Sequence, residues 1–204
     1  MKFAILPAAG KSIRMGRPKL ALPLGERTIL EHVLAALHQA EVEHLVVVLG
    51  PHVRELGPLA HNAGAHVCQL AEETPDMRAT VEQGLRWIEE HLQPRPDDAW
   101  LLVPADHPAL APSVIRELEQ ARQSSPARSI FVPTFHDRRG HPLTLTWQHV
   151  GGIRAHTAGE GLNTYVRKHA ADVLEVPVAS EAVLWDLDTP EDYERLRLRW
   201  PLHC

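Results

Sequence analysis

The chain has 204 residues, 44% of them hydrophobic and 23% charged, which is enough for one α/β domain with a sizeable core. A formal net charge of −5 argues against a surface that coats nucleic acid, and no apolar run is long enough to span a membrane. The only cysteines, Cys68 and Cys204, argue against a disulfide framework, and no secretory signal is expected, so the predicted location is the cytoplasm.

Apolar strand-like segments alternate with amphipathic helix-like segments along the chain. Strands are predicted at 3–6, 45–50, 65–70, 100–104, 130–133, 142–146 and 173–178. Helices are predicted at 28–40, 53–62, 77–92, 112–122 and 162–169, and from Pro190 onward; Thr28 and Glu31 form a capping box. Repeated β-α units with short connections predict an α/β fold. We expect one domain over residues 1–204, with three α/β/α layers around a mainly parallel sheet.

The segment between the first strand and Lys19 is the most informative part of the chain. It contains Gly10 and Gly16, and no acidic residue precedes Glu26. Its cations are Lys11, Arg14, Arg17 and Lys19. Glycines let backbone N–H groups approach an anion and the cations neutralise it, so a polyphosphate site is predicted. After residue 25 the chain is acidic, with 16 Lys and Arg against 26 Asp and Glu, which favours a small anionic ligand over a long polyanion.

Two familiar phosphate-binding loops do not fit this segment. The P-loop pattern requires a glycine where Ile5 lies, which argues against a kinase or a GTPase. The fingerprint Gly-x-Gly-x-x-Gly is absent, which argues against a nicotinamide dehydrogenase. The structural alternative is a surface turn whose basic residues serve solubility, but glycines, cations and a preceding strand coincide here.

Asp106 follows the strand predicted at 100–104, in the run Pro104-Ala-Asp-His-Pro108. The carboxyl ends of parallel strands form the ligand-binding edge of an α/β sheet, so Asp106 is expected near the Gly-rich loop. Mg²⁺ takes oxygen ligands together with substrate phosphates, which makes Asp106 the first candidate for a metal ligand. The alternative is that Asp106 only caps a turn before Pro108.

The loop Leu6-Pro-Ala-Ala-Gly-Lys-Ser-Ile-Arg-Met-Gly-Arg-Pro-Lys19 resembles the signature loop of nucleotidyltransferases that activate phosphorylated metabolites with an NTP. It is most similar to the molybdenum-cofactor cytidylyltransferase and guanylyltransferase group, the MobA-like NTP transferases. The resemblance implies a Rossmann-like nucleotidyltransferase (nucleotide-diphospho-sugar transferase) fold and Mg²⁺-dependent transfer of an NMP with release of pyrophosphate. Ala9 stands where guanylyl members have a second Gly, so the cytidylyl members are closer and CTP is favoured over GTP.

The resemblance extends to two acidic motifs. Asp106 and Pro108 match the family's metal-binding Asp-x-Pro, with His107 where Gln is common. The stretch from Asp186 to Asp192 matches an Asp-x-Asp-Thr-Pro-Glu-Asp motif that brings a second carboxylate to the metal. The resemblance implies Asp188 as that ligand, with Asp186 as the alternative. The same stretch is also a good helix start, with Asp188 or Thr189 as the N-cap.

Three further segments resemble the family in part. Asp76-Met-Arg-Ala-Thr80 stands where the family has Gly-Met-Ser-x-Ser beside the base and ribose, and Arg78 there either contacts phosphate or alters the acceptor site. Arg139-Gly-His-Pro142 resembles a Gly-His-Pro turn on the acceptor side, and Gly159-Glu-Gly161 resembles a Gly-Asp-x-Gly loop.

Carried over residue by residue, the resemblance implies catalytic roles for Lys19, Arg14 and Asp106. The nucleotide-binding residues that it implies are Pro7, Ala8, Ala9, Gly10, Lys11, Ser12, Arg14, Met15, Gly16, Lys19, Arg78 and Thr80. Those on the acceptor side are His107, Gly140 and His141.

The expected substrates are an NTP and a phosphorylated small molecule that accepts the nucleotide. CTP is the favoured NTP, and molybdopterin is the best candidate for the acceptor. An enzyme that receives the finished cofactor is the expected protein partner. Sugar phosphates and other metabolite phosphates are alternative acceptors. A non-catalytic nucleotide- or cofactor-binding chaperone on the same fold is the alternative from another class.

Overall fold

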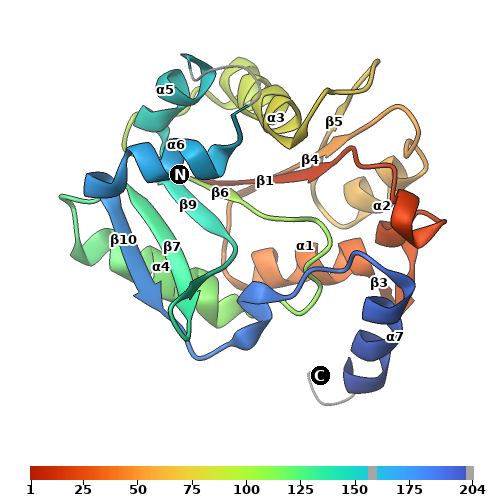
Figure 1. Ribbon diagram of the computed structural model, residues 1–204. Helices are drawn as coiled ribbons and strands as arrows, with labels where there is room; N and C mark the ends of the chain where they lie inside the picture. The colour runs from red at the N-terminus through yellow and green to blue at the C-terminus, as the bar shows by residue number, and fades with distance from the viewer. Residues whose placement is uncertain (156–159, 201–204) are drawn as a thin grey trace.

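An eight-stranded sheet runs through the middle of the molecule in the computed structural model, which describes residues 1–155 and 160–200 (Figure 1). The strand order is β10-β7-β9-β6-β1-β4-β5, with β8 paired to β7. The strands are β1 Lys2–Ala8, β4 His44–Leu49, β5 His66–Gln69, β6 Ala99–Leu102, β7 Ile130–Phe135, β8 Arg138–Arg139, β9 Leu143–Thr146 and β10 Val173–Pro177. Neighbours pair in parallel except at β9 and β8, which confirms the predicted mainly parallel sheet.

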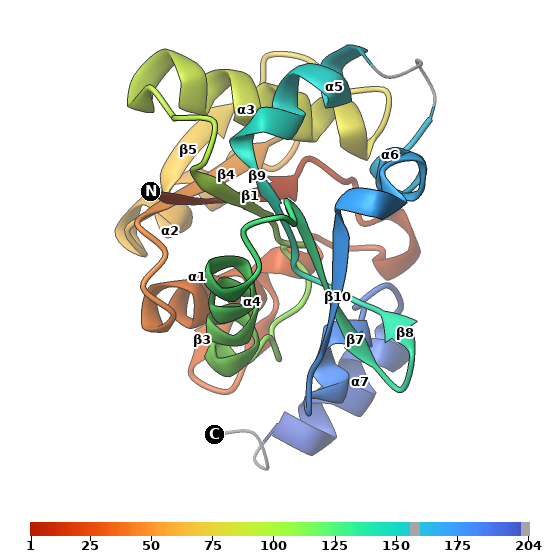
Figure 2. The ribbon, with the colours of Figure 1, turned by 90° about the vertical axis from the view of Figure 1, so that its left-hand side faces the viewer.

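Helices cover both faces of this sheet and give the predicted three layers (Figure 2). One face carries α1 Ile29–Gln39, α2 Leu56–Asn62 and α4 Pro112–Ser124; the other carries α3 Met77–Leu92, α5 Val150–Ala155 and α6 Leu162–Lys168. The last helix, α7 Pro190–Arg199, packs near a small ribbon of β2 Pro23–Leu24 and β3 Arg27–Thr28. Short 3₁₀ turns are η1 Ile13–Met15, η2 Lys19–Ala21, η3 Trp147–His149, η4 Ala170–Asp172 and η5 Glu181–Leu184.

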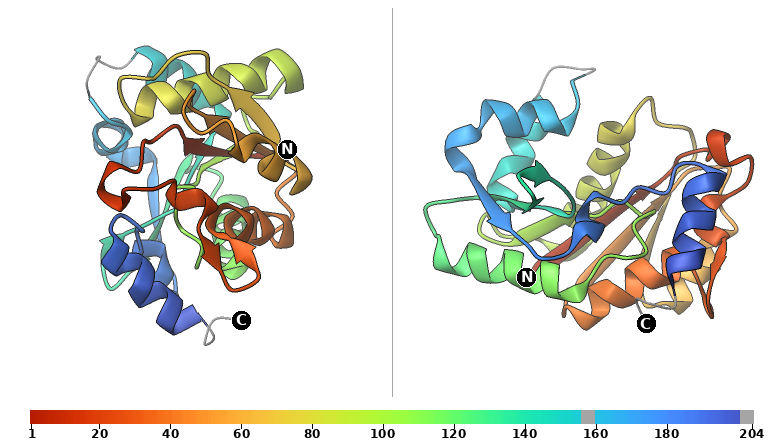
Figure 3. Two further views of the ribbon diagram at one scale, coloured as in Figure 1. Left: turned by 90° about the vertical axis from the view of Figure 1, so that its right-hand side faces the viewer. Right: turned by 60° about the horizontal axis from the view of Figure 1, so that its bottom comes forward.

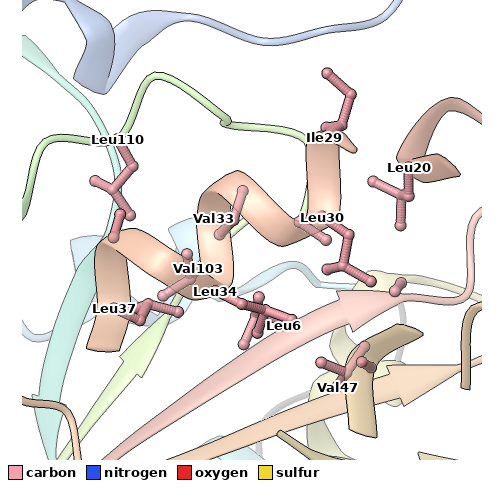
Figure 4. Close-up of a cluster of buried hydrophobic side chains, with 14 of the residues drawn as sticks. Leu6, Leu20, Ile29, Leu30, Val33, Leu34, Leu37, Val47, Val103 and Leu110 are labelled. Atoms are coloured by element: carbon pink, nitrogen blue, oxygen red, sulfur yellow. The ribbon is translucent and has the colours of Figure 1, made fainter. Parts of the chain in front are cut away.

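The core forms because strand residues alternate between the two faces. Ala4 and Leu6 of β1 belong to the hydrophobic cluster under α1, whereas Phe3 and Ile5 belong to the cluster under α3. On α1, a stripe of apolar residues at helical spacing packs toward the sheet: Leu30, Val33, Leu34 and Leu37 (Figure 4). The predicted capping box at the start of this helix is confirmed, because the Thr28 N–H donates to Glu31 Oε2 at 2.7 Å and Thr28 Oγ1 accepts from the Glu31 N–H at 3.3 Å.

The structure moves the start of one predicted helix and adds elements that were not predicted, among them α5 and the strand β8. The helix predicted at 53–62 begins only at Leu56, because the Val53 N–H donates to the Gly50 carbonyl in a turn. Helix α5 contains Gly151 and Gly152, which disfavour a helix, but Val150 and Ile153 are buried and stabilise it. The β7–β8 hairpin turns at 136–137, where both residues have positive φ without being glycine.

Gly84 of α3 illustrates how closely this helix packs on the sheet. A Cβ at Gly84 would lie 2.8 Å from Ile5 Cγ2 and 3.0 Å from Val48 Cγ2. Alanine would gain ~1 kcal/mol in helix propensity, but overpacking costs ~1–3 kcal/mol. We therefore expect Gly84→Ala to lower the free energy of unfolding by about 1 kcal/mol, as measured by urea denaturation. Gly151→Ala, where a Cβ meets nothing within 4 Å, is the matched control and should be neutral or stabilising; equal effects at both sites would contradict this account of the packing.

The carboxyl ends of the parallel strands β1, β4 and β6 meet at one edge of the sheet. The basic loop leaves β1 there, and Asp106 follows β6 there. This arrangement brings the predicted site residues toward one another. Among the described residues, no helix combines the length and the apolarity needed to cross a membrane.

Candidate functional site

The basic loop after β1 lines a cavity of about 520 Å³ at the carboxyl edge of the sheet. The residues from Pro7 to Arg14 and Lys19 line it from the loop side, and Thr74, Asp76 and Thr80 line it near the start of α3. The loop turns through left-handed backbone at Ser12 (φ 49°) and Gly16 (φ 66°). Ser12 Oγ accepts from the Lys19 N–H at 3.3 Å, and Met15 is buried in the core below. These contacts fix the conformation of the loop around the cavity.

Lys19 joins the loop to both acidic motifs. Its Nζ contacts Asp106 Oδ2, donates to the Leu187 carbonyl at 2.8 Å and lies 3.3 Å from Asp188 Oδ1. Arg14 lies on the other side of Asp188, with its Nη2 2.9 Å from Oδ2. Asp106 and Asp188 are 20% and 35% exposed, so each carboxylate is open to a ligand as well as to its cation. The predicted residues Arg14, Lys19, Asp106 and Asp188 therefore form one cluster.

The sequence left two candidates for the N-cap of the last helix, and the structure assigns Thr189. Thr189 Oγ1 accepts from the Asp192 N–H at 3.2 Å, and Asp192 Oδ2 accepts from the Thr189 N–H at 2.9 Å. Because Thr189 caps α7, the side chain of Asp188 is available to the cluster. Two aspartates at the rim of this cavity are an oxygen donor set that suits Mg²⁺ or a similar hard cation, with substrate and water completing the shell.

Asp186 lies away from this cluster and pairs with His107. A carboxylate can only accept, so His107 Nε2 donates to Asp186 Oδ1, at 2.8 Å. This hydrogen bond is the main cause that lowers the pKa of Asp186. His107 is buried, and its ring lies edge-on to that of His141 with 5.7 Å between the centroids.

His141 provides a pH-dependent contribution to stability. Burial, and then the neighbouring His107, lower the pKa of His141 from 6.5 to about 4. The unfolded state therefore binds a proton more readily than the folded state, so the free energy of unfolding should fall as the pH drops from 6.5 toward 4. The loss is at most ~3 kcal/mol, because one pKa unit corresponds to about 1.4 kcal/mol. Urea denaturation from neutral pH down to the acid range should show a shallower fall for His141→Gln than for the parent chain; parallel curves would contradict this.

The structure brings some partly matching residues to the cavity and leaves others elsewhere. Asp76 caps α3 by accepting from the Ala79 N–H at 2.8 Å, and Thr80 shares a 2.6 Å hydrogen bond with Thr74. Arg78 pairs with Glu82 one turn along α3, at 3.2 Å, and does not line the cavity.

The Gly-His-Pro turn packs against the segment that leads to Asp186. The His141 N–H donates to the Val183 carbonyl at 2.9 Å, and a Cβ at Gly140 would overlap that carbonyl. Of the Gly-Glu-Gly loop, Gly159 lies outside the described residues.

Two features of the site were missed by sequence reasoning. Glu73 lines the cavity and pairs with Lys11 at 2.9 Å. Because Glu72 and Glu73 are adjacent, the sequence does not show which of the two side chains faces the cavity. A second cavity of about 470 Å³ adjoins the first and shares Arg14, Asp106 and Asp188 with it. Trp185 and Arg195 also line this second cavity. The cavity exists because α7 packs against the rest of the chain, and local sequence patterns do not predict that packing.

Comparison with known proteins identifies the family. The model of the MobA-like NTP transferase domain matches residues 4–173. The chain belongs to this family. It is therefore a nucleotidyltransferase, and the predicted family is confirmed.

Relatives of the MobA-like chain agree with this assignment. The purine catabolism protein PucB of Bacillus subtilis is 30% identical over 204 residues, covering 96% of this chain and 95% of PucB. A 2-C-methyl-D-erythritol 4-phosphate cytidylyltransferase of Azoarcus is 38% identical over 126 residues, which is 57% of this chain and 52% of that enzyme.

Solved structures agree with the fold of the MobA-like chain. Rv0371c of Mycobacterium tuberculosis superimposes with a TM-score of 0.80 at 27% identity, covering 96% of this chain and 97% of that one. The same mycobacterial protein has also been solved in complex with manganese, with a TM-score of 0.72 at 26% identity and 97% and 98% coverage. A nucleotidyl transferase of Methanothermobacter, at 22% identity and a TM-score of 0.78, covers 99% of this chain and 98% of its own and shares the fold.

Proposed function

We propose that this nucleotidyltransferase moves CMP from CTP to the phosphate of a small-molecule acceptor, with Mg²⁺ held by Asp106 and Asp188 and with molybdopterin as the acceptor. The observation that carries the proposal is the meeting of Lys19, Asp106 and Asp188 at the rim of the cavity lined by the basic loop. A triphosphate brings negative charge to this loop, and a divalent cation balances the two carboxylates.

The reaction joins an acceptor oxygen to phosphorus. An oxygen of the acceptor phosphate attacks the α-phosphorus of CTP in line, the bond from that phosphorus to the bridging oxygen breaks, and pyrophosphate leaves with the electron pair. An ionised phosphate is already a nucleophile, so no strong general base is needed. Catalysis then consists of positioning and charge stabilisation, as in other phosphoryl chemistry.

Each residue of the site is proposed to contribute to the reaction according to its position. Backbone N–H groups from Ala9 to Ser12 cradle the triphosphate, Arg14 neutralises its β- and γ-phosphates, and Lys19 stabilises charge that builds at the α-phosphate. Asp106 and Asp188 supply the oxygen ligands of the metal, and the bound ion contributes Lewis-acid stabilisation of phosphate oxygens. Pro7, Ala8 and Thr80 line the same cavity and complete the nucleotide site.

The choice of CTP rests on Ala9 and on relatives. Ala9 leaves less room than the Gly of the guanylyl members, which favours a pyrimidine base. Several relatives, including the Azoarcus protein, carry the name cytidylyltransferase. GTP is the alternative nucleotide.

The acceptor proposal follows the family resemblance, with a sugar phosphate as the second candidate. Molybdopterin is the acceptor of the group that the loop resembles most. The Azoarcus relative is named for a sugar-alcohol phosphate, 2-C-methyl-D-erythritol 4-phosphate, which supports the alternative. We propose that the acceptor side is formed by His107, which follows Asp106, together with Gly140 and His141.

Pyrophosphate release tests the function. CTP, GTP, ATP and UTP should each be assayed with Mg²⁺ or Mn²⁺ against molybdopterin, 2-C-methyl-D-erythritol 4-phosphate and several sugar phosphates. Release that requires CTP and molybdopterin is the expected result. Release with another phosphate would keep the mechanism and replace the acceptor, whereas nucleotide binding without release from any acceptor would favour the non-catalytic binding protein.

A further inference from the structure

The segment that carries Asp188 has little regular structure of its own. It runs from β10 to α7 along the carboxyl edge of the sheet, past the end of β1 (Figure 3). Only the short η5 turn, Glu181–Leu184, interrupts it. The position of Asp188 relative to Asp106 therefore depends on contacts that this segment makes with other parts of the chain.

Contacts at both ends hold the segment in place. At its start, the Val183 carbonyl accepts from the His141 N–H at 2.9 Å, with Gly140 packed against it. At its end, Thr189 caps α7, and Lys19 Nζ donates to the Leu187 carbonyl. The Lys19 Nζ also contacts Asp106, so this cation bridges the two carboxylates, but it belongs to neither of the segments that carry them.

The hydrogen bond between His107 and Asp186 joins these two segments directly. His107 is the chain neighbour of Asp106, and Asp186 is two residues before Asp188. The 2.8 Å contact between Nε2 and Oδ1 thus joins the two segments that carry the carboxylates. His107 is only 4% exposed, so its ring is fixed by packing, whereas the Asp186 side chain is 66% exposed and is held by this bond.

We propose that the His107–Asp186 hydrogen bond is a positioning contact that sets the separation of Asp106 and Asp188 for a divalent cation. This inference rests on the proposed function, and it gives His107 and Asp186 a role in which neither touches metal or nucleotide. A Gln at position 107 would keep the same bond. The Gln amide nitrogen and His Nε2 are separated from Cβ by the same number of bonds, and both donate.

Mn²⁺ binding, followed by the electron paramagnetic resonance signal of the free ion, tests the proposal independently of turnover. His107→Ala and Asp186→Ala should each weaken Mn²⁺ binding about 10- to 100-fold, as is typical when a group that orients a metal ligand is removed. The double variant should be no worse than either single variant, because both remove the same bond. His107→Gln and Asp186→Asn, which keep a donor and an acceptor, should bind within about threefold of the parent chain.

Matched measurements separate positioning from general damage. The affinity for CTP without metal should be similar in all variants, because the contact acts on the carboxylates and not on the loop. The midpoint of thermal unfolding should be similar in Asp186→Ala, Asp186→Asn and His107→Gln, whereas His107→Ala should lower it because it leaves a cavity at a buried position. Glu175→Gln, which alters an exposed 2.7 Å pair with Arg139 at the far edge of the sheet, is the control and should leave Mn²⁺ binding unchanged.

The outcomes distinguish this inference from the function on which it rests. If the parent chain binds Mn²⁺ and releases pyrophosphate but His107→Ala binds Mn²⁺ equally well, the positioning contact is wrong and the function stands. If Asp186→Asn loses Mn²⁺ binding as completely as Asp188→Asn, Asp186 is itself a ligand and the inference is overturned. If the parent chain shows neither metal binding nor pyrophosphate release, both proposals are wrong.

Discussion

Replacing Asp106 with alanine is expected to lower turnover about 1000-fold while leaving the fold intact. The carboxylate lies on the rim of the cavity, contacts Lys19 and is proposed to hold the metal. A metal ion supplies several kcal/mol of transition-state stabilisation, and about 1.4 kcal/mol corresponds to a factor of ten. Steady-state pyrophosphate release measures the loss. A partly exposed carboxylate makes little contribution to the core, so the thermal unfolding midpoint should change little.

Asp97→Ala is the matched control for Asp106→Ala. Asp97 is an exposed aspartate that precedes β6, whereas Asp106 follows the same strand at the opposite edge of the sheet. Its replacement should leave pyrophosphate release within about twofold of the parent chain, as expected of a surface substitution. Near-normal turnover of Asp106→Ala at saturating metal would contradict the metal assignment.

Replacing Lys19 with alanine is expected to reduce kcat about 100- to 1000-fold, the loss typical of removing one group that stabilises developing charge. The Nζ of Lys19 is held between Asp106, Asp188 and the Leu187 carbonyl and is only 18% exposed, so it is already fixed where charge would build. Such a group stabilises the transition state more than the ground state. The dissociation constant for CTP, measured by equilibrium titration, should therefore rise less than tenfold.

Two other lysines serve as controls for Lys19→Ala. Lys11 belongs to the same loop, but its partner is the half-exposed Glu73 at 2.9 Å, so Lys11→Ala should affect KM for CTP more than kcat. Lys168, the last residue of α6, pairs with Glu160 away from the cavity, and Lys168→Ala should change neither constant. Equal losses in kcat and in CTP affinity for Lys19→Ala would contradict a transition-state role.

Local signals predicted most of the fold because they coincide with the tertiary packing. The helix predicted at 77–92 has the observed bounds Met77–Leu92, and its apolar residues Val81, Leu85 and Ile88 are buried against the sheet. Thr28 and Glu31 form their capping box without help from distant residues. Where pattern and packing agree, the sequence is sufficient.

Other elements depend on distant contacts and could not be predicted from local sequence. A strand was predicted at 142–146, but a strand pattern does not encode direction. The antiparallel pairing of this strand, β9, with β6 and β7 appears only in the structure. Helix α5 opposes its own glycine propensity, and buried Val150 and Ile153 stabilise it.

The same distinction applies to the candidate site. Lys19 and Asp106 are 87 residues apart, yet both follow parallel strands, so the rule that ligands bind at the carboxyl ends of strands predicts their meeting. No comparable rule predicts the hydrogen bond between His107 and Asp186, because it joins a turn to an irregular segment. Whether Asp186 or Asp188 approaches Lys19 was therefore open until the structure placed Asp188 beside Lys19 and Asp186 beside His107.

The most direct test of the proposed reaction follows two phosphates of one nucleotide at once. CTP labelled differently at the α- and γ-phosphates is incubated with the protein, Mg²⁺ and molybdopterin, and the products are separated. CMP transfer predicts that the α-label appears on the acceptor and the γ-label in pyrophosphate, in equal amounts, and that Asp106→Ala produces neither. The γ-label on the acceptor, with the α-label left in CDP, would contradict nucleotidyl transfer and the role assigned to Lys19, Asp106 and Asp188.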